Sequence, residues 1–192
     1  MIDQLRVLQT LQKKGVTTPF FVEEAHRIAE IGLPALVIYY PRAKRGEEKK
    51  ARQTMIARYG DVIPALMSAA REKKMYIQQY VSGYEVVCGV MEHKGNVVPL
   101  MPIEAIPRAH YEAVPWHWSE KQIELCQEMA VRAHRAVRAK QYSCVRCVID
   151  KDKKIYVTGI DQTPPLAQTS LFVQSARAAG FTFAELKKRN LP

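Results

Sequence analysis

The segment Ile155–Leu171 (IYVTGIDQTPPLAQTSL) carries the most specific pattern in the chain. It begins with β-branched and aromatic residues, which favour a strand, and the charged run Asp150–Lys154 before it predicts a hairpin turn. Pro164-Pro165 cannot donate ladder hydrogen bonds and ends the strand. After Thr169, apolar residues recur at helical spacing as far as Gly180, which predicts a helix. A strand, a proline turn and a helix N-terminus together favour a site for the anionic end of a ligand.

This segment resembles the C-terminal signature of D-alanine–D-alanine ligases, members of the ATP-grasp superfamily. In that signature a strand ends in an acid and an asparagine, and Pro-Gly-Met-Thr and a Ser-Leu pair follow. The similarity runs from Asp3–Arg6 through Ile77–Gly83 to Phe181–Leu186. It implies an α+β, ATP-grasp-like fold with mostly antiparallel sheets in two lobes, residues 1–82 and 83–192, and a nucleotide between the lobes. It also implies that the separate N-terminal domain of the ligases is absent from this chain.

Hydrophobic periodicity predicts the remaining elements. Helices are expected over Asp3–Lys13, Glu23–Gly32, Glu47–Tyr59, Val62–Lys73 and Glu120–Lys140, with a last short helix capped by Thr182 and Glu185. Within Val62–Lys73, the inward residues are expected to be Ile63, Leu66 and Ala69 or Ala70. Strands are expected over Phe20–Val22, Ala35–Tyr40, Met75–Val81, Glu85–Met91 and Asn96–Ile106, and a loop over Arg108–Ser119.

The composition is that of a globular protein, with 47% hydrophobic and 25% charged residues in a chain of 192. The longest apolar runs are too short to span a bilayer, and the chain does not begin with the basic and apolar pattern of a secretory signal. Four cysteines are too few for a disulfide framework. A cytoplasmic protein that does not associate with membranes is therefore expected.

Cys144-Val-Arg-Cys147 matches the C-x-x-C pattern of metal and redox sites. The surrounding residues alternate as in a strand, so two cysteines three positions apart point to opposite faces. The chain has no second pair to complete a zinc site. No metal site is expected at these cysteines.

Cations exceed anions, with 29 Lys+Arg against 19 Asp+Glu and a net charge of +10. Six of these cations recur on one face of the helix Glu120–Lys140 or fall in the hairpin after it: Arg132, Arg135, Arg138, Lys151, Lys153 and Lys154. If they form one patch, it would bind a protein partner or an anionic partner such as nucleic acid. The alternative is a solvated basic face without a dedicated ligand.

The resemblance also implies which residues should hold the phosphates. An ATP-dependent carboxylate–amine ligase needs cations on the transferring phosphate and carboxylates on the magnesium ions that bridge the phosphates. The two phosphate lysines of the family fall on Gln4 and Tyr40, which carry no charge. The phosphate-covering loop reads Arg42–Gly46, which is basic but lacks the small residues needed for close backbone approach.

The metal positions differ from the family in the same way. The transition-state arginine of the family falls on Cys144, and its magnesium aspartate falls on Arg146. Its magnesium glutamate falls on Gly159 and its asparagine on Asp161. A shift of two residues restores the arginine at Arg146 but places Val148 on the aspartate. Both alignments lose the metal aspartate, so neither a catalytic residue nor a metal ligand is predicted.

The adenine-binding hinge of the family keeps its shape in Ile77–Glu85. The position of the acid that contacts adenine is Gln78, and the glutamate that contacts ribose is Glu85, for which an exposed acid at a strand start is the alternative. The vestigial nucleotide site is predicted to comprise Gln78, Gln79, Tyr80, Val81 and Glu85. Nucleotide binding is expected to be weak or absent, so no cofactor is assigned.

At the amino-acid end of the family's site, Ser170-Leu171 matches the Ser-Leu pair, although a serine at a helix start is also a common cap. Pro165 replaces the signature glycine and removes a backbone N–H. These substitutions predict a pseudoenzyme that acts by binding a partner. One alternative is an active carboxylate–amine ligase with a site rebuilt around Asp161, Glu85 and the Arg42–Arg45 loop, or completed by another chain. The other is a basic scaffold protein associated with nucleic acid or an RNA-containing assembly.

Overall fold

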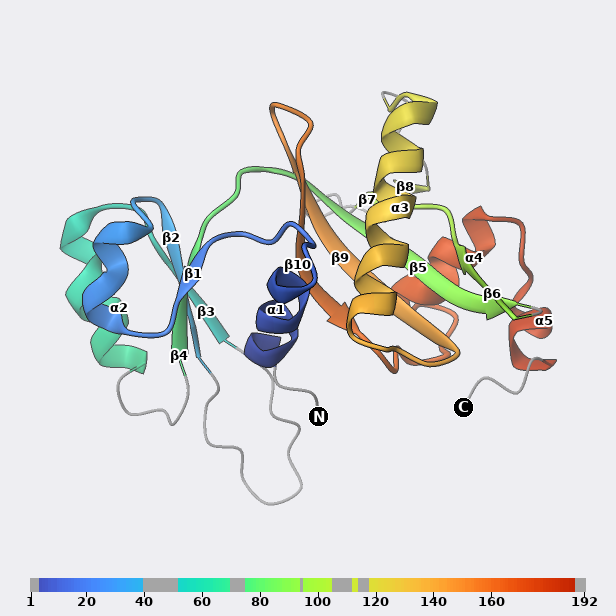
Figure 1. The fold of residues 1–192 in the computed structure, drawn as a ribbon, viewed down its shortest axis with the longest axis horizontal. Helices are drawn as coiled ribbons and strands as arrows, with labels where there is room; N and C mark the ends of the chain where they lie inside the picture. Colours follow the sequence, from blue (N-terminus) through green and yellow to red (C-terminus); the bar gives the residue numbers. More distant parts are fainter. Residues whose placement is uncertain are drawn as a thin grey trace, which may run out of the picture. The chain divides into compact units, whose positions relative to one another are not determined.

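The computed structural model describes residues 4–39, 52–69, 75–93, 95–104, 112–113 and 118–188. The chain divides into two compact units, Pro19–Val81 and Ile2–Thr18 with Ser82–Pro192. Each unit is built on its own antiparallel sheet with helices packed on it (Figure 1). The predicted α+β class with antiparallel sheets is therefore confirmed.

The first unit is organised around a four-stranded sheet in the order β1-β4-β2-β3. Its strands are β1 (Phe21–Val22), β2 (Ala35–Tyr39), β3 (Arg52–Ile56) and β4 (Met75–Gln79). The helix α2 (Val62–Ala69) packs on the sheet after the short 3-10 helix η2 (Tyr59–Asp61), and a second 3-10 helix, η1 (Ala25–Glu30), follows β1. The core is formed by Val22, Ala35, Val37, Ile56, Ala65, Ala69 and Ile77.

Two predictions for this unit are wrong. The helix expected over Glu47–Tyr59 is replaced, in its described part, by β3, which pairs with β2 from Ala35–Ile56 to Tyr39–Arg52. Strand pairing between distant segments overrides the local propensity of such residues. In α2, Ile63 is 68% exposed, whereas Ala65 and Ala69 are buried. Ile63 was thus wrongly expected to face inward, whereas Leu66, which packs against the core, and the buried Ala69 lie on the inward face as predicted.

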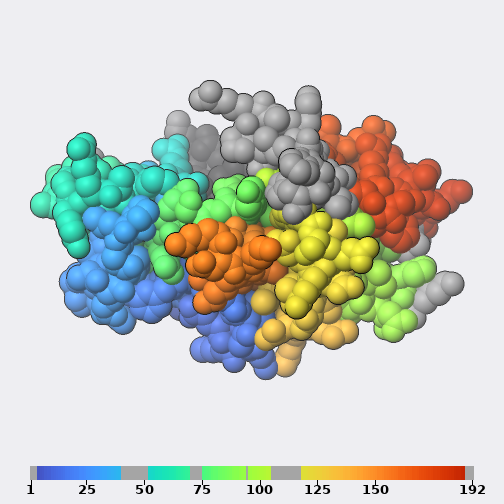
Figure 2. Space-filling model, turned by 90° about the horizontal axis from the view of Figure 1, so that it is seen from above, coloured from blue at the N-terminus to red at the C-terminus, as the bar shows by residue number. Residues whose placement is uncertain are grey.

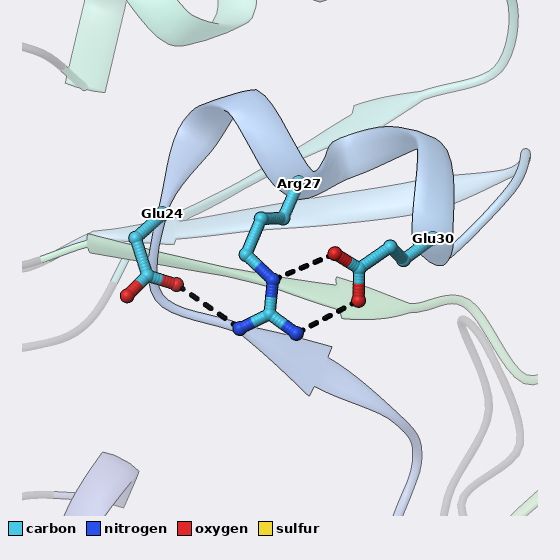
Figure 3. Close-up of polar contacts among 3 residues, drawn as sticks. All are labelled: Glu24, Arg27 and Glu30. Atoms are coloured by element: carbon cyan, nitrogen blue, oxygen red, sulfur yellow. Dashed lines mark hydrogen bonds and ion pairs between the residues drawn. The ribbon is translucent and has the colours of Figure 1, made fainter.

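The segment predicted as a helix over Glu23–Gly32 is the 3-10 helix η1, whose exposed surface is organised by Arg27 (Figure 3). The Arg27 Nε and Nη2 donate to the two carboxylate oxygens of Glu30 at 2.7 and 2.8 Å, and Nη1 donates to Glu24 at 3.4 Å. These bonds raise the pKa of Arg27, and the hydrogen bond from Arg27 lowers the pKa of Glu30. The charge of Arg27 is therefore compensated locally, and solvent screens what remains.

The second unit holds a six-stranded sheet in the order β10-β9-β5-β7-β8, with β6 also paired to β5. The strands are β5 (Gly83–His93), β6 (Asn96–Pro99), β7 (Ile103–Glu104), β8 (Glu112–Ala113), β9 (Tyr142–Asp150) and β10 (Ile155–Asp161). The pairing of β5 with β9 extends from Gly83–Asp150 to Met91–Tyr142. The predicted hairpin between β9 and β10 is confirmed, and the Asp150 Oδ1 closes its turn by accepting the N–H groups of Asp152 and Lys154 at 2.9 Å each.

Helices cover both faces of this sheet. The helices α4 (Leu171–Ala178) and α5 (Phe183–Lys188) pack on one face, where they bury Phe172 and Leu186 against residues that include Cys144. The helix α3 (Glu120–Ala136) crosses the other face, where Cys126 contacts Cys147 (Figure 1). The two cysteines of the C-x-x-C pattern thus lie on opposite faces, as predicted.

The helix α1 (Gln4–Lys13) is part of the second unit, although the predicted first lobe began at residue 1. It packs against β10 and α3 through its apolar face, which buries Leu5, Leu8 and Leu11. Hydrogen bonds extend the contact beyond the helix. Arg132 Nη2 donates to the Gly15 carbonyl at 2.8 Å, and the Val157 N–H donates to the Thr17 carbonyl at 2.8 Å.

The predicted helix starts are confirmed where a side chain caps the helix. Ser119 and Gln122 form a reciprocal capping box at the start of α3. Thr182 and Glu185 do the same at α5, with hydrogen bonds of 2.7 Å from the Thr182 N–H and hydroxyl to the Glu185 carboxylate. No helix in the described ranges is long and apolar enough to cross a membrane.

The buried His134 of α3 is expected to make the free energy of unfolding depend on pH. Its side chain is 1% exposed, and Nδ1 lies 2.8 Å from the Ser143 hydroxyl on β9. Burial lowers the pKa of His134, with Glu92 opposing and Arg135 adding to the shift. The unfolded state therefore takes up the proton first, and the free energy of unfolding is expected to fall as pH drops below about 6.5, by at most about 1.4 kcal/mol per pH unit. Urea titrations between pH 5.5 and 7.5 measure this slope.

The matched variant for the His134 experiment is His134→Gln, which keeps a polar side chain but does not titrate. The variant is expected to be less stable at pH 7.5 and to lose the component of the slope between pH 5.5 and 6.5. Equal slopes for the wild type and the variant would mean that His134 titrates alike in the folded and unfolded states.

Candidate functional site

The candidate site lies where β9 and β10 pair, at the positions that the resemblance assigns to metal and transition-state residues. Cys144 is opposite Asp161, and Arg146 is opposite Gly159. The register shifts between Val157 and Gly159. Side chains of directly paired residues lie on the same face of a sheet. The four positions therefore come together on one face, the face on which Cys144 packs with α4.

Gly159 is the closest-packed position of this cluster. A Cβ atom added to it would lie 2.9 Å from Gln4 Nε2 and 3.0 Å from Arg146 Nη2. Gln4 Nε2 also donates a 3.0 Å hydrogen bond to the Thr158 carbonyl. The Gln4 amide and the Arg146 guanidinium thus occupy the space that a side chain at position 159 would need. A glutamate there would have to displace both.

Asp161 is the carboxylate of this cluster. Its Oδ1 accepts the Thr163 N–H at 3.0 Å. Burial raises the pKa of the Cys144 thiol to about 12, with Asp161 adding to the shift and Arg146 opposing it. The thiol is therefore neutral at physiological pH. Arg146 is exposed and makes no ion pair within the described part of the chain.

These residues do not fit the magnesium that the resemblance implies. Mg²⁺ prefers an octahedron of oxygen ligands, and carboxylates supply most of its protein contacts. The cluster offers one carboxylate, a neutral thiol, an amide donor and a guanidinium, which repels a divalent cation. The described residues contain no group of three or more His, Cys, Asp or Glu side chains that could hold a metal ion.

The residues predicted for the adenine hinge belong to different units. Gln78 of β4 is 4% exposed, and its Oε1 has no hydrogen-bond partner among the described residues. Gln79 holds β1 through a 2.8 Å backbone bond to the Phe20 carbonyl, and the Tyr80 N–H donates to the Pro34 carbonyl at 3.2 Å. Val81 ends the first unit. The backbone groups of Gln79 and Tyr80 are therefore used by the fold, whereas Gln78 retains an unused acceptor.

Glu85 lies in the second unit, on β5, and its side chain is exposed. The structure gives it no side-chain hydrogen bond or ion pair within the described ranges. This environment fits the alternative of an exposed acid at a strand start. The other predicted phosphate positions, Tyr40 and Arg42–Gly46, lie outside the described residues.

Ser170 is the N-cap of α4, and its hydroxyl accepts the Val173 N–H at 3.3 Å. Leu171 packs against the hydrophobic core of the second unit. Both residues of the Ser-Leu pair thus have structural roles that explain their types without a ligand.

The six predicted basic residues fall into two groups near the two ends of α3. The hairpin lysines (Lys151, Lys153 and Lys154) lie near the start of α3, because two of them line a pocket together with Trp118 and Gln122. Arg132 and Arg135 lie in the last turns of α3, and Arg138 follows its C-cap. A helix rises 1.5 Å per residue, so Gln122 and Arg135 are about 20 Å apart along α3. Binding of a partner at either group stays a prediction.

That pocket has a volume of about 620 Å³ and is a feature that the sequence did not predict. Its walls come from the start of β5, the start of α3 and the β9–β10 hairpin, which are far apart in the sequence. The one available signal was an aromatic residue, Trp118, directly before a helix cap in a segment expected to be a loop.

Comparison with known proteins places the chain in a family. Residues 61–191, well over half of the chain, match the family described as D-ala D-ala ligase C-terminus. The D-alanine–D-alanine ligase of Synechococcus sp. (strain JA-3-3Ab) is 24% identical over 212 residues, which cover 99% of this chain and 63% of the relative. The ligase of Porphyromonas gingivalis (strain ATCC BAA-308 / W83) is 25% identical over 195 residues, covering 95% and 57%.

Solved structures agree. The D-alanine–D-alanine ligase from Bacillus anthracis complexed with ATP matches with a TM-score of 0.78 and 21% identity, over 97% of this chain and 62% of that one. The VanG D-Ala:D-Ser ligase from Enterococcus faecalis matches with a TM-score of 0.77 and 16% identity, over 97% and 59%. This chain spans about three fifths of the length of these relatives, and the likeness shows an ATP-grasp fold. The chain belongs to the family of D-alanine–D-alanine ligase C-terminal domains.

Proposed function

We propose that this chain is a ligase-type ATP-grasp domain that acts by binding and does not catalyse ligation. The observation that carries the proposal is the packing of Arg146 and Gln4 over Gly159. A magnesium ion at the transferring phosphate needs carboxylates, and here a guanidinium and an amide take up that space beside the single carboxylate of Asp161. The names of the relatives describe ligases, and one of them was solved with ATP.

Magnesium-dependent ATP binding is expected to be absent in the micromolar range. Each lost charge-assisted contact weakens binding by about 1.5–3 kcal/mol, so three such losses weaken it by at least about a thousandfold. Calorimetry of the purified chain with ATP and excess magnesium measures this, and a phosphate-release assay with D-alanine measures turnover. The Bacillus anthracis ligase is the positive control in both assays.

The packing of Arg146 and Gln4 over Gly159 is tested directly by adding carboxylates to this cluster. Arg146→Asp combined with Gly159→Glu places two further acids beside Asp161 and is expected to create measurable Mg²⁺ binding. Arg135→Asp with Gly60→Glu makes the same change in charge at exposed positions and is expected to create none. A micromolar, magnesium-dependent ATP affinity of the wild type, or phosphate release with D-alanine, would contradict the proposal.

An active ligase completed by a second chain is the competing function. It is favoured by one observation, that the chain spans only about three fifths of the relatives it matches. Phosphate release that appears only when a candidate partner is added would establish it. We place the protein in the cytoplasm with an anionic partner, which cell fractionation and the salt dependence of recovered complexes test.

A further inference from the structure

The pocket at the hairpin end of α3 is separate from the Arg146 cluster. Figure 2 shows the β9–β10 hairpin (orange) and the beginning of α3 (yellow) side by side on one face of the second unit. Tyr84 and Ile149, which line the pocket, are paired across β5 and β9. Side chains alternate along a strand, so Ile149 and Arg146 point to opposite faces of β9. The pocket therefore opens on the α3 side of the sheet.

The charge on the pocket wall is positive. Lys151 and Lys153 line it, are exposed, and make no ion pair within the described ranges. Asp150 also lines it, but its Oδ1 is used by the two backbone N–H groups that it accepts in the hairpin turn. Lys153 has a φ of 63°, a left-handed conformation that is uncommon for residues other than glycine. A lysine thus occupies a turn position that glycine or asparagine would adopt more easily.

Aromatic and amide groups complete the wall. The Tyr84 side chain is 50% exposed, and Trp118 lines the pocket from the segment before α3. Gln122 uses its Oε1 to accept the Ser119 N–H and hydroxyl at 3.1 and 3.0 Å. That geometry leaves the Gln122 Nε2 available as a donor. An exposed ring, two ammonium groups and an amide donor match a ligand that carries a flat ring and an anionic group.

We propose that this pocket binds a nucleotide, with the base stacked on Tyr84 and the phosphate held by Lys151 and Lys153. Stacking on an aromatic ring and a cationic contact to phosphate are the two interactions that single nucleotides and single-stranded nucleic acids share. The volume of about 620 Å³ lies within the range of small-molecule sites. Binding needs no metal, and the proposal does not depend on the function proposed for the Arg146 cluster.

In the test, AMP is titrated into the full chain in buffer that contains EDTA. Binding is measured by calorimetry and by tryptophan fluorescence. Lys151→Gln with Lys153→Gln is expected to weaken AMP binding at least tenfold. Lys154→Gln is the matched control, because Lys154 lies in the same hairpin with its Nζ 5.0 Å from the Tyr156 ring and does not line the pocket. This control is expected to bind AMP as the wild type does.

Three further arms define the ligand. Tyr84→Leu is expected to weaken AMP binding about tenfold, and adenosine is expected to bind more weakly than AMP. A single-stranded oligoribonucleotide replaces AMP in the third arm. If the natural ligand is single-stranded nucleic acid, the oligoribonucleotide binds more tightly than AMP. The slope of its log binding constant against log salt concentration then falls by about one for each lysine removed. If the source is a free nucleotide, AMP binds at least as tightly as the strand.

The proposal is overturned if AMP and the oligoribonucleotide both fail to bind at millimolar concentration. It is also overturned if the double lysine variant and the Lys154→Gln control bind equally well, because binding would then lie elsewhere. Circular dichroism monitors the fold of each variant. Lys151→Gln alone, at an exposed position of the turn, keeps the test decisive if the double variant does not fold.

Discussion

Phe172→Ala is expected to lower the free energy of unfolding by about 3–5 kcal/mol. Phe172 is 0% exposed and belongs to the cluster that fixes α4 and α5 to the sheet. Its ring lies with its centroid 4.8 Å from that of Tyr142 on β9, at an angle of 46°. Truncation removes the largest buried side chain of α4 and leaves a cavity between the helix and the sheet. Urea denaturation followed by circular dichroism measures the loss.

Arg177→Ala on the same helix is the control for Phe172→Ala. Arg177 is exposed near the end of α4, so its removal is expected to change stability by no more than about 0.5 kcal/mol. A loss below about 1 kcal/mol for Phe172→Ala would mean that α4 is not held by this core.

The helix that contains Phe172 shows what local sequence signals predict well. Its serine start, its end before Gly180 and the apolar face formed by Leu171, Phe172 and Ala176 are confirmed. Ser175 is buried on the same helix, and the structure gives the reason for a polar residue there. Its hydroxyl accepts the Gly89 N–H at 2.9 Å and donates to the Met101 carbonyl at 2.6 Å, so it joins two backbone segments of the core.

The wrong predictions concern elements that are decided by distant partners. β3 is a strand because β2 pairs with it, and no periodicity within Arg52–Ile56 shows this. α2 begins at Val62 as predicted, but Ile63 is exposed and Ala65 is buried, because the packing of the helix on β2 and β3 decides which side chains it buries. Local signals predict the existence of an element better than its register or its partner.

Only part of the candidate site was predictable, because local sequence signals do not show which distant segments meet in the fold. The resemblance brought Cys144, Arg146, Gly159 and Asp161 to notice, and the pairing of β9 with β10 places them together. The part played by Gln4 required the fold, because it reaches the Thr158 carbonyl from 154 residues away. The pocket near Trp118 was missed altogether, since three separate segments form it and none of them carries a motif.

Gly83→Ala is expected to destabilise the second unit by about 3 kcal/mol, at the upper end of overpacking effects. Gly83 begins β5 opposite Asp150, where the strand meets the end of β9. An added Cβ would lie 2.7 Å from the Ile149 carbonyl carbon and 3.0 Å from the Asp150 Cα, and it would also collide with the Ile149 carbonyl oxygen. These are backbone atoms, so no change of rotamer relieves the contact, and the two strands must separate.

The separation of β5 from β9 also predicts which backbone amides lose protection in the Gly83→Ala variant. Amide hydrogen exchange is expected to accelerate at the first pairs of β5 and β9 and in the adjoining hairpin, while the pairs near Met91–Tyr142 keep their protection. Gly60→Ala is the control, because nothing lies within 4 Å of its added Cβ, and it is expected to change stability by no more than about 0.5 kcal/mol. Gly83, Asp150 and Lys151 also line the pocket, so a strand pair forced apart at Gly83 changes the spacing between Tyr84 and the hairpin lysines. Unchanged exchange at β5 and β9 in the Gly83→Ala variant would show that the strands accommodate the methyl group without separating.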